Sequence, residues 1–543
     1  MSGLEFIFDV NANLLIKLFL LSLCICLLHI AHCQSDSYRM PYWQQEVNYN
    51  IDVTLRDKDN TVAAFEKIEY TNNSPDSLKF IWFHLWPNAY KNENTAFAKQ
   101  IFREKDGKKK WKDLKDKGWI DSIDFEVDGV KARTEPDPEN IDIIKLLLPS
   151  ILPPGGKIAI STPFIDHLPT YISRSGHIGQ SYMICQWYPK PAVYDRKGWH
   201  PMPYLEMGEF YSEYGKFTVR ITAPSNYVIA ATGTMQDEKE LKHYKDLGAQ
   251  NLNSRNKKYA PLTTQPTKTV SYYAENVHDF AWFADKDFII EYDTMQMASG
   301  RTIDVFAYHP TSGSSILWDS STAYIKDAVR HYSSWIGEYP FNVVQAVEGP
   351  KNLTAGGMEY PTITLITEPD ANEENLDVTI AHEVGHNWFY GVIGSDERDH
   401  AWMDEGINTY FEFRYEHEKY KNNILFGDAI PQNVKDAPLD QFEAAVYLAL
   451  LRLPMESPID LSAQDYPSDD EYEMSVYMKA AIWLYMIEVK EGRSKLDNAF
   501  KEYFNEWKFK HPYPEDFQKV LEKSMGKSFD QYFMLLKQKG KLR

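Results

Sequence analysis

The motif His382-Glu383-Val384-Gly385-His386 limits what this chain can fold into more than any other feature of its sequence. Residues four apart lie on one face of an α-helix, so both imidazoles can reach a single metal ion while Glu383 sits beside them. The flanking residues are compatible with a helix that ends at Gly391. The motif therefore predicts a helix that carries two metal ligands, and the plain alternative is a helix with two surface histidines.

A third metal ligand is predicted at Glu405, which eighteen residues separate from His386. It lies in the segment Trp402-Met403-Asp404-Glu405-Gly406-Ile407-Asn408. Two histidines and one carboxylate leave the fourth tetrahedral position of a zinc ion open for water, which is the arrangement of a catalytic zinc site. We therefore expect one Zn²⁺ per chain, held by His382, His386 and Glu405.

Together these segments resemble the gluzincin metallopeptidases of the aminopeptidase N and leukotriene hydrolase family. In that family the third ligand follows at this spacing, within a Trp-Leu-Asn-Glu-Gly-like segment. The resemblance covers most of residues 45–540. It implies multidomain α and β architecture: an N-terminal β-rich saddle or sandwich domain, then a thermolysin-like α/β zinc catalytic domain that ends in helices. Only 66 residues follow Tyr477, so the chain resembles a secreted bacterial-type member that lacks the large C-terminal domain.

A second motif, Gly356-Gly357-Met358-Glu359-Tyr360, resembles the Gly-x-Met-Glu-Asn segment of the family. In the family this segment is a strand edge that pairs with the substrate backbone, and its glutamate, here Glu359, receives the free amino group of the substrate. Gly356 and Gly357 would let another backbone approach, and a carboxylate forms a charge-assisted bond with an ammonium group. Without the resemblance, the glycine pair would indicate a plain turn.

A third motif, Ser475-Val476-Tyr477-Met478-Lys479-Ala480-Ala481, is similar to the Tyr-Glu-Lys-Gly segment of the family. The resemblance implies that Tyr477 donates a hydrogen bond to the oxyanion, whereas a tyrosine at the start of an amphipathic helix is by default a core residue. Upstream, Tyr188 stands where the family often carries a second glutamate that holds the substrate amine. Glu359 is therefore expected to act without an acidic partner.

The resemblance implies a zinc metallopeptidase, and an aminopeptidase that removes N-terminal residues from peptides is the first interpretation. Glu383 would be the general base that takes a proton from water and passes it to the leaving amine. An endopeptidase or tripeptide-trimming protease of the same fold stays open, favoured by Tyr188 and the short C-terminal part. A catalytically inactive, surface-binding relative also stays open, although such a protein would not need Glu383.

The charge balance bears on partners and on substrates. With 58 Lys and Arg against 78 Asp and Glu, the net charge of -20 repels phosphate backbones, so nucleic acid is excluded as a partner. Peptides are the expected partners, and the protein is expected to be a monomer. An acidic segment leads into Tyr477 and is either a solvated loop or a cleft entrance that favours cationic substrates. Its acidic residues are Asp465, Asp469, Asp470, Glu471 and Glu473.

Residues 14–30 are almost unbroken apolar sequence, typical of a secretory signal peptide that spans residues 1–33. The protein would then be exported, to the periplasm, the cell surface or the extracellular space. An uncleaved membrane anchor is the alternative, and only in that case would the protein contact a membrane. Cys185 is the one cysteine after residue 33, so no intrachain disulfide is expected and the thiol is interpreted as a core residue.

Hydrophobic periodicity divides the rest of the chain. Short alternating runs with Pro-Gly turns predict a β-rich domain over residues 34–309. After residue 310 the helical period dominates, and residues 310–543 are predicted to form the catalytic domain with closing helices. Residues 362–367 are an exception, since this β-branched run is expected to be a strand just before the metal-binding helix.

Overall fold

The computed structural model describes residues 42–254, 257–311, 315–351, 356–368 and 371–542 of the chain. The predicted signal peptide lies outside these ranges. Residues 44–543 form one compact unit, and every element below belongs to it. None of the helices within the described ranges combines the length and the apolar character needed to cross a membrane.

The first part of this unit is built on strands with alternating burial. In β1 (Glu46–Arg56) every second side chain is buried, as a sheet with one covered face requires. β1 pairs in parallel with β15 (Gly215–Pro224) and antiparallel with β2 (Thr61–Thr71). The same sheet, nine-stranded, also contains β4 (Trp119–Asp121), β5 (Glu126–Val127), β6 (Val130–Lys131), β9 (Lys157–His167), β17 (Thr234–Met235) and β18 (Thr267–Val277).

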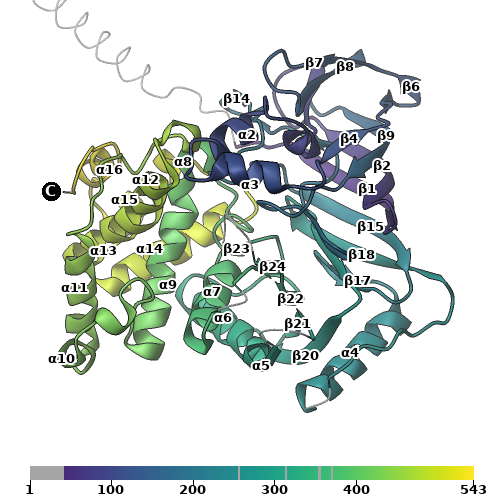
Figure 1. The fold of residues 1–543 in the computed structure, drawn as a ribbon. Helices are drawn as coiled ribbons and strands as arrows, with labels where there is room; N and C mark the ends of the chain where they lie inside the picture. Colours follow the sequence, from purple (N-terminus) through teal and green to yellow (C-terminus); the bar gives the residue numbers. More distant parts are fainter. Residues whose placement is uncertain (1–41, 255–256, 312–314, 352–355, 369–370, 543) are drawn as a thin grey trace, which may run out of the picture. The chain divides into compact units, whose positions relative to one another are not determined.

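Two four-stranded sheets complete this β-rich part (Figure 1). One contains β3 (Leu78–His84), β7 (Arg133–Pro136), β8 (Ile143–Leu152) and β12 (Lys190–Pro191). The other contains β10 (Gly176–Ile178), β11 (Ser181–Ile184), β16 (Val228–Ala231) and β19 (Trp282–Asp285). Cys185 follows β11, is buried and forms no disulfide, which confirms its interpretation as a core residue.

A five-stranded sheet lies between this part and the helices. Its order is β20 (Phe288–Gln296), β21 (Thr302–Pro310), β22 (Val343–Glu348), β24 (Ile363–Ile366) and β23 (Gly357–Met358). Val305 belongs to the helical core and its neighbour Phe306 to the β-rich core, so the two faces of the sheet close two different cores. β24 falls within the strand predicted at residues 362–367. The sheet takes strands from both sides of residue 310, and the domain boundary there stays a prediction.

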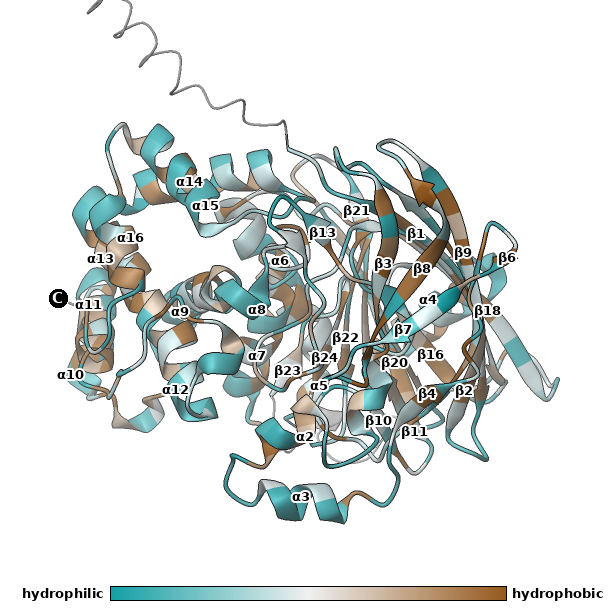
Figure 2. Ribbon diagram, turned by 90° about the horizontal axis from the view of Figure 1, so that it is seen from above, coloured by the Kyte–Doolittle hydropathy of each residue, from teal (hydrophilic) through white to brown (hydrophobic). Residues whose placement is uncertain are grey.

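The remainder is helical, as the periodicity predicts. It contains α6 (Ser321–Trp335), α7 (Glu373–Gly385), α8 (Glu397–His400), α9 (Glu405–Tyr420), α11 (Leu439–Leu450), α12 (Asp469–Glu473), α13 (Ala480–Glu491), α14 (Arg493–Trp507), α15 (Pro514–Met525) and α16 (Asp530–Leu536). Figure 2 shows that α12 and α3 (Gly107–Asp113) are mainly hydrophilic, whereas β3 and β8 are rich in hydrophobic residues.

The helix with the His-Glu-x-x-His motif ends earlier than predicted. α7 stops at Gly385 rather than at Gly391, because the side chain of Asn387 redirects the chain. Its amide nitrogen donates to the carbonyl of Val384 at 3.0 Å, and its oxygen accepts from the backbone N–H of Thr362 at 3.0 Å. The turn closes through the carbonyl of His386, which accepts from the N–H of Gly391 at 2.8 Å.

Candidate active site

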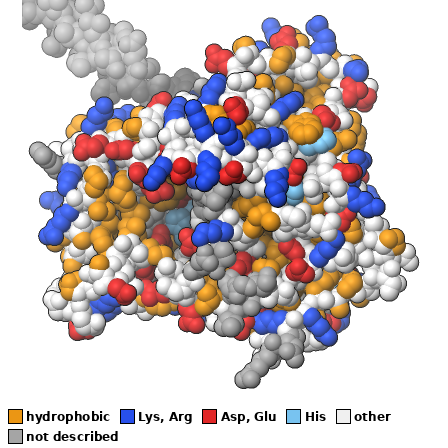
Figure 3. All heavy atoms as spheres, in the orientation of Figure 1, with side chains coloured by type: hydrophobic (Ala, Val, Ile, Leu, Met, Phe, Trp, Pro, Cys, Tyr) orange, Lys and Arg blue, Asp and Glu red, His pale blue; other side chains and the backbone are white. Residues whose placement is uncertain are grey.

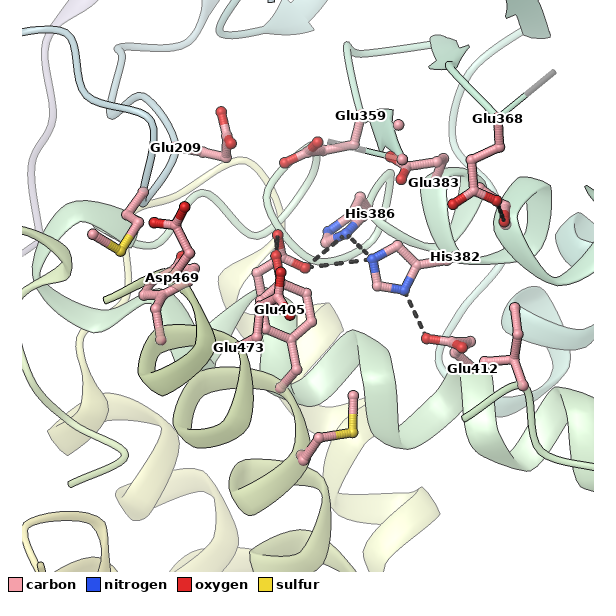
Figure 4. A pocket seen from close by; sticks show the side chains of 18 of the residues that line it. Glu209, Glu359, Glu368, His382, Glu383, His386, Glu405, Glu412, Asp469 and Glu473 are labelled. Carbon is pink, nitrogen blue, oxygen red and sulfur yellow. Dashed lines mark hydrogen bonds and ion pairs between the residues drawn. The ribbon is translucent and has the colours of Figure 1, made fainter. Parts of the chain in front are cut away.

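A pocket of about 350 Å³ is lined by residues of α7, α9, β23 and the segment before α13. Figure 3 shows histidine and acidic side chains at the bottom of a hollow on this face, and Figure 4 shows the pocket from close by. All eight site residues predicted from the sequence line this pocket: Gly356, Gly357, Glu359, His382, Glu383, His386, Glu405 and Tyr477.

The three predicted metal ligands converge on one point. The Nε2 atoms of His382 and His386 lie 3.0 Å apart. Oε2 of Glu405 lies 3.4 Å from the first and 3.2 Å from the second. This oxygen is buried and makes no hydrogen bond within the described part of the chain. Two imidazoles and one carboxylate with an unpartnered oxygen have the donor chemistry that would hold a zinc ion.

Two further carboxylates orient the imidazole rings. Oε2 of Glu412 lies 2.8 Å from Nδ1 of His382, and Oδ1 of Asp404 lies 2.6 Å from Nδ1 of His386. Each contact fixes its ring so that Nε2 faces the common point. Burial would lower the pKa of His382, but Glu405 and Glu412 outweigh it and raise this pKa to about 10. Because a metal ion binds the neutral imidazole, it would compete with a proton for His382.

Glu383 lies beside the ligands and against a glycine. A Cβ atom on Gly357 would come within 2.2 Å of Oε1 of Glu383, so only glycine leaves room for the carboxylate there. Burial raises the pKa of Glu383 to about 7, with the charges of Glu405 and Glu209 adding to it and those of the two histidines opposing it. A carboxylate with such a pKa is suited to exchange protons near neutral pH.

Tyr477 lies in the pocket on a π-helical turn, η5 (Met474–Lys479), rather than on a regular helix. Its hydroxyl donates to Oε1 of Glu405 at 2.5 Å. Gly406 permits this arrangement, because a Cβ there would lie 2.4 Å from Cβ of Ala480 and 2.6 Å from the carbonyl oxygen of Val476. The close approach of α9 and η5 thus places the phenol over the metal ligands.

Glu359 follows β23 at the edge of the five-stranded sheet. β23 pairs with β24, and no strand among the described residues pairs with its other side, so this edge can accept an extended peptide. The side chain of Glu359 is buried, and its Oε1 has no hydrogen-bond partner among the described residues. Burial raises the pKa of Glu359 well above its usual range, nearby carboxylates add to the shift, and His386 opposes it. Within the described residues, Glu359 thus forms no ion pair with a lysine or an arginine, and its Oε1 is free to accept a hydrogen bond.

The expectation for Tyr188 is wrong. Tyr188 lies in the core of the β-rich part and outside the pocket, where its hydroxyl donates to Oδ1 of Asp279 at 2.8 Å. Its aromatic ring packs against Tyr49 and Trp187, so the local sequence builds core there instead of pocket wall. Glu209 lines the pocket instead, and its charge contributes to the raised pKa of Glu359.

The sequence pattern does not identify Glu206 and Glu209 as pocket residues, because they lie in a loop without periodicity between β14 (Gly198–Trp199) and β15. The sequence feature that could point to them is the presence of two acidic residues within an otherwise aromatic and apolar run. Glu412 is predictable in principle, because a residue seven positions after Glu405 lies on the same face of α9. In the acidic segment before Tyr477, only Asp469 and Glu473 line the pocket.

The fold places His382, His386 and Glu405 in one cluster that could hold a metal ion. Residues 324–535 match the family described as "Peptidase family M1 domain". This match agrees with the resemblance to the aminopeptidase N family.

Leucine aminopeptidase 2 of Yarrowia lipolytica is 27% identical over 169 residues, which are 30% of this chain and 25% of that protein. Aminopeptidase B of Rattus norvegicus is 28% identical over 215 residues, which are 38% of this chain and 30% of that protein. The match thus spans less than a third of the length of either relative.

A mutant M1 zinc metallopeptidase from Deinococcus radiodurans, solved with a Tyr-Ser-Ala substrate, has a TM-score of 0.61 and 13% identity. The similarity covers 92% of this chain and 95% of that chain. This likeness shows a shared fold, and it confirms the predicted β-rich part followed by a helical part.

Proposed function

We propose that the protein is a zinc-dependent aminopeptidase that removes N-terminal residues from peptides. One observation carries the proposal: the buried Glu359, whose Oε1 has no hydrogen-bond partner among the described residues, lines the same pocket as the three convergent metal ligands. An ammonium group is the cation that a peptide brings, and it would satisfy this carboxylate. The names of the two relatives support the proposal.

His382, His386 and Glu405 would hold one zinc ion per chain. When bound, zinc would act as a Lewis acid toward the scissile carbonyl and would acidify a water molecule. Glu383 takes a proton from the attacking water and later gives it to the leaving amine. Tyr477, whose pKa is raised well above its usual range by burial and by Glu405, stays protonated and donates to the developing oxyanion.

An endopeptidase of the same fold is the competing proposal. Tyr188 and the short C-terminal part favour it, but Tyr188 does not line the pocket. An inactive surface-binding protein would not need Glu383 beside the ligand cluster, nor a phenol hydroxyl over it.

A panel of peptides with free and N-acetylated termini tests the proposed function. The zinc-loaded protein is expected to cleave only the free-amine members, one residue at a time from the N-terminus, as followed by mass spectrometry. Cleavage of acetylated peptides at internal bonds, with equal rates for both sets, would contradict an aminopeptidase.

We also propose that the protein is exported by its N-terminal segment and acts as a monomer outside the cytoplasm. The apolar run at residues 14–30 supports export. N-terminal sequencing of protein from fractionated cells tests this, with a start near Gln34 expected and an intact residue 1 contradicting cleavage.

A further inference from the structure

One end of the pocket carries carboxylates for which the proposed reaction has no use. They are Glu206, on the loop before β15, and Asp469 and Glu473, at the two ends of α12. None of them lies within the convergent ligand cluster. The residues come from segments more than 260 positions apart in the sequence, so the fold gathers acidic groups here.

One carboxylate oxygen of Glu206 is buried without a hydrogen bond among the described residues. Its side chain is 8% exposed, and Oε2 has no hydrogen-bond partner within the described residues. The nearest cation, Arg174, lies 3.8 Å away through Nη1. The hydrogens of Arg174 are directed elsewhere: Nε and Nη2 donate to Glu209, Nη2 also donates to the backbone carbonyl of Glu206, and Nη1 donates to Oγ of Ser173. Glu206 is thus left with an unused acceptor in the pocket wall.

Asp469 is in a similar position. Its Oδ1 is buried and has no hydrogen-bond partner in the described part of the chain. Burial and the charges of Glu104, Glu206 and Glu473 raise the pKa of Asp469 to about 7, although Lys110 opposes them. Like charges crowd this end of the pocket, and a cation placed between them would relieve the repulsion.

The pocket also supplies apolar walls, formed by Met207, Met474 and Met478. Met207 and Met474 directly follow the acidic residues Glu206 and Glu473 in the sequence. Thioether side chains adapt to a flexible aliphatic stem, and carboxylates beyond them suit the charged end of that stem. A lysine or arginine side chain has this combination of an apolar stem and a cationic head.

The acidic end lies on the amine side of the reaction centre. In Figure 4, Glu209 and Asp469 lie on one side of the two histidines, whereas Glu368 and Glu412 lie on the other. Glu209 is near enough to Glu359 to affect its pKa. A peptide whose ammonium group binds Glu359 would therefore place its first side chain, rather than its second, toward Asp469.

We propose that Glu206, Asp469 and Glu473 form a subsite for the cationic side chain of an N-terminal lysine or arginine. The inference rests on the proposed function and gives it a substrate class.

Arginyl and citrullyl 4-nitroanilides test the subsite, because citrulline has the shape of arginine without the charge. We expect kcat/KM to be at least about tenfold higher for the arginyl substrate. Asp469→Asn and Glu473→Gln should each lower this ratio several-fold and leave citrullyl hydrolysis within about twofold. Asp470→Asn is the matched control, since Asp470 is the exposed neighbour of Asp469 and does not line the pocket.

Equal kcat/KM for the arginyl and citrullyl substrates would overturn the proposed subsite, and so would a ratio of the two values that neither variant changes. Either result would leave the proposed aminopeptidase activity standing. If neither substrate is hydrolysed, the proposed function fails, and calorimetric titration with L-arginine and L-citrulline then decides the subsite on its own. Tighter binding of L-arginine that Asp469→Asn abolishes would support it. Equal binding would overturn it. A preference for a basic second residue in dipeptide substrates would also overturn the assignment to the first residue.

Discussion

Metal binding and proton transfer are assigned to different residues of the pocket, and a substitution of Glu383 tests this separation. Glu383 is not one of the three convergent ligands, yet its carboxylate lies within 4.8 Å of a ring nitrogen of His386, and its pKa is raised to about 7. Glu383→Gln keeps the volume and removes the base. We expect zinc content to stay at about one per chain while kcat falls by at least about 100-fold. Metal analysis beside steady-state kinetics checks this, and near wild-type turnover would rule out Glu383 as the base.

The phenol of Tyr477 gives a second prediction at this scale. Tyr477→Phe removes one donor to the oxyanion and hardly changes the packing. Loss of one such donor costs about 10²–10³ in kcat, and KM should change far less. Unchanged kcat would return Tyr477 to a purely structural role.

Much of the site was predictable at the scale of residues because a metal ligand set has a fixed chemistry and helix spacing. The prediction of His382, His386 and Glu405 required only that helical spacing and the separation of two segments along the sequence. Glu206 and Glu209 were not predictable, because a loop has no period that tells which side chains point into a pocket. The prediction for Tyr188 was wrong because a sequence position shared with a family does not determine whether a side chain faces the core or a cavity.

At the scale of elements, the contact between α9 and η5 determines where Tyr477 lies. Gly406→Ala would force a methyl group against Ala480 and the carbonyl of Val476. We expect a loss of about 1–3 kcal/mol in unfolding free energy and a lower kcat, with zinc still bound. The double variant Gly406→Ala, Ala480→Gly restores space and should recover part of both losses. Kinetics and chemical denaturation of Gly406→Ala, Ala480→Gly and the double variant measure the coupling between the two positions. Strictly additive effects would argue against a direct contact.

Some helices and strands near the site are predictable from the sequence, and others are not. The strand at β24 and the helix α7 follow from β-branched residues and from helical spacing. The early end of α7 did not, because it depends on Asn387 accepting from Thr362, a contact between residues that only tertiary structure brings together. The π-helical turn at η5 likewise leaves no local pattern in the sequence.

At the scale of the whole molecule, His200 joins distant parts of the chain. Its Nε2 lies 3.0 Å from Oδ1 of Asp195, and its Nδ1 lies 3.2 Å from Oδ2 of Asp396, which precedes α8. Burial would lower the pKa of His200, but these two carboxylates outweigh it and raise the pKa to about 10.

This raised pKa predicts how stability depends on pH. A histidine whose pKa is about 6.5 when unfolded and about 10 when folded adds stability that is fully present below pH 6.5. The stability is lost as the pH rises from 6.5 through 10. The unfolding free energy of the wild type should therefore fall between pH 7 and pH 10, and that of His200→Gln should fall less. Denaturation curves of both proteins at pH 7 and pH 10 test this. If the unfolding free energy falls by the same amount in both proteins, the two ion pairs of His200 do not stabilise the fold.

The proposed aminopeptidase activity depends on Glu359 binding the free amino group of the substrate. The most direct measurement is kcat/KM of wild type and Glu359→Gln on a peptide amide and its N-acetylated counterpart, with zinc content confirmed for both proteins. A buried carboxylate that loses its ammonium partner should cost at least about 100-fold on the free-amine substrate. Whatever slow cleavage the acetylated substrate undergoes should stay the same. If the substitution lowers both rates alike, or neither, Glu359 does not bind the amine and the account of this protein as an aminopeptidase is wrong.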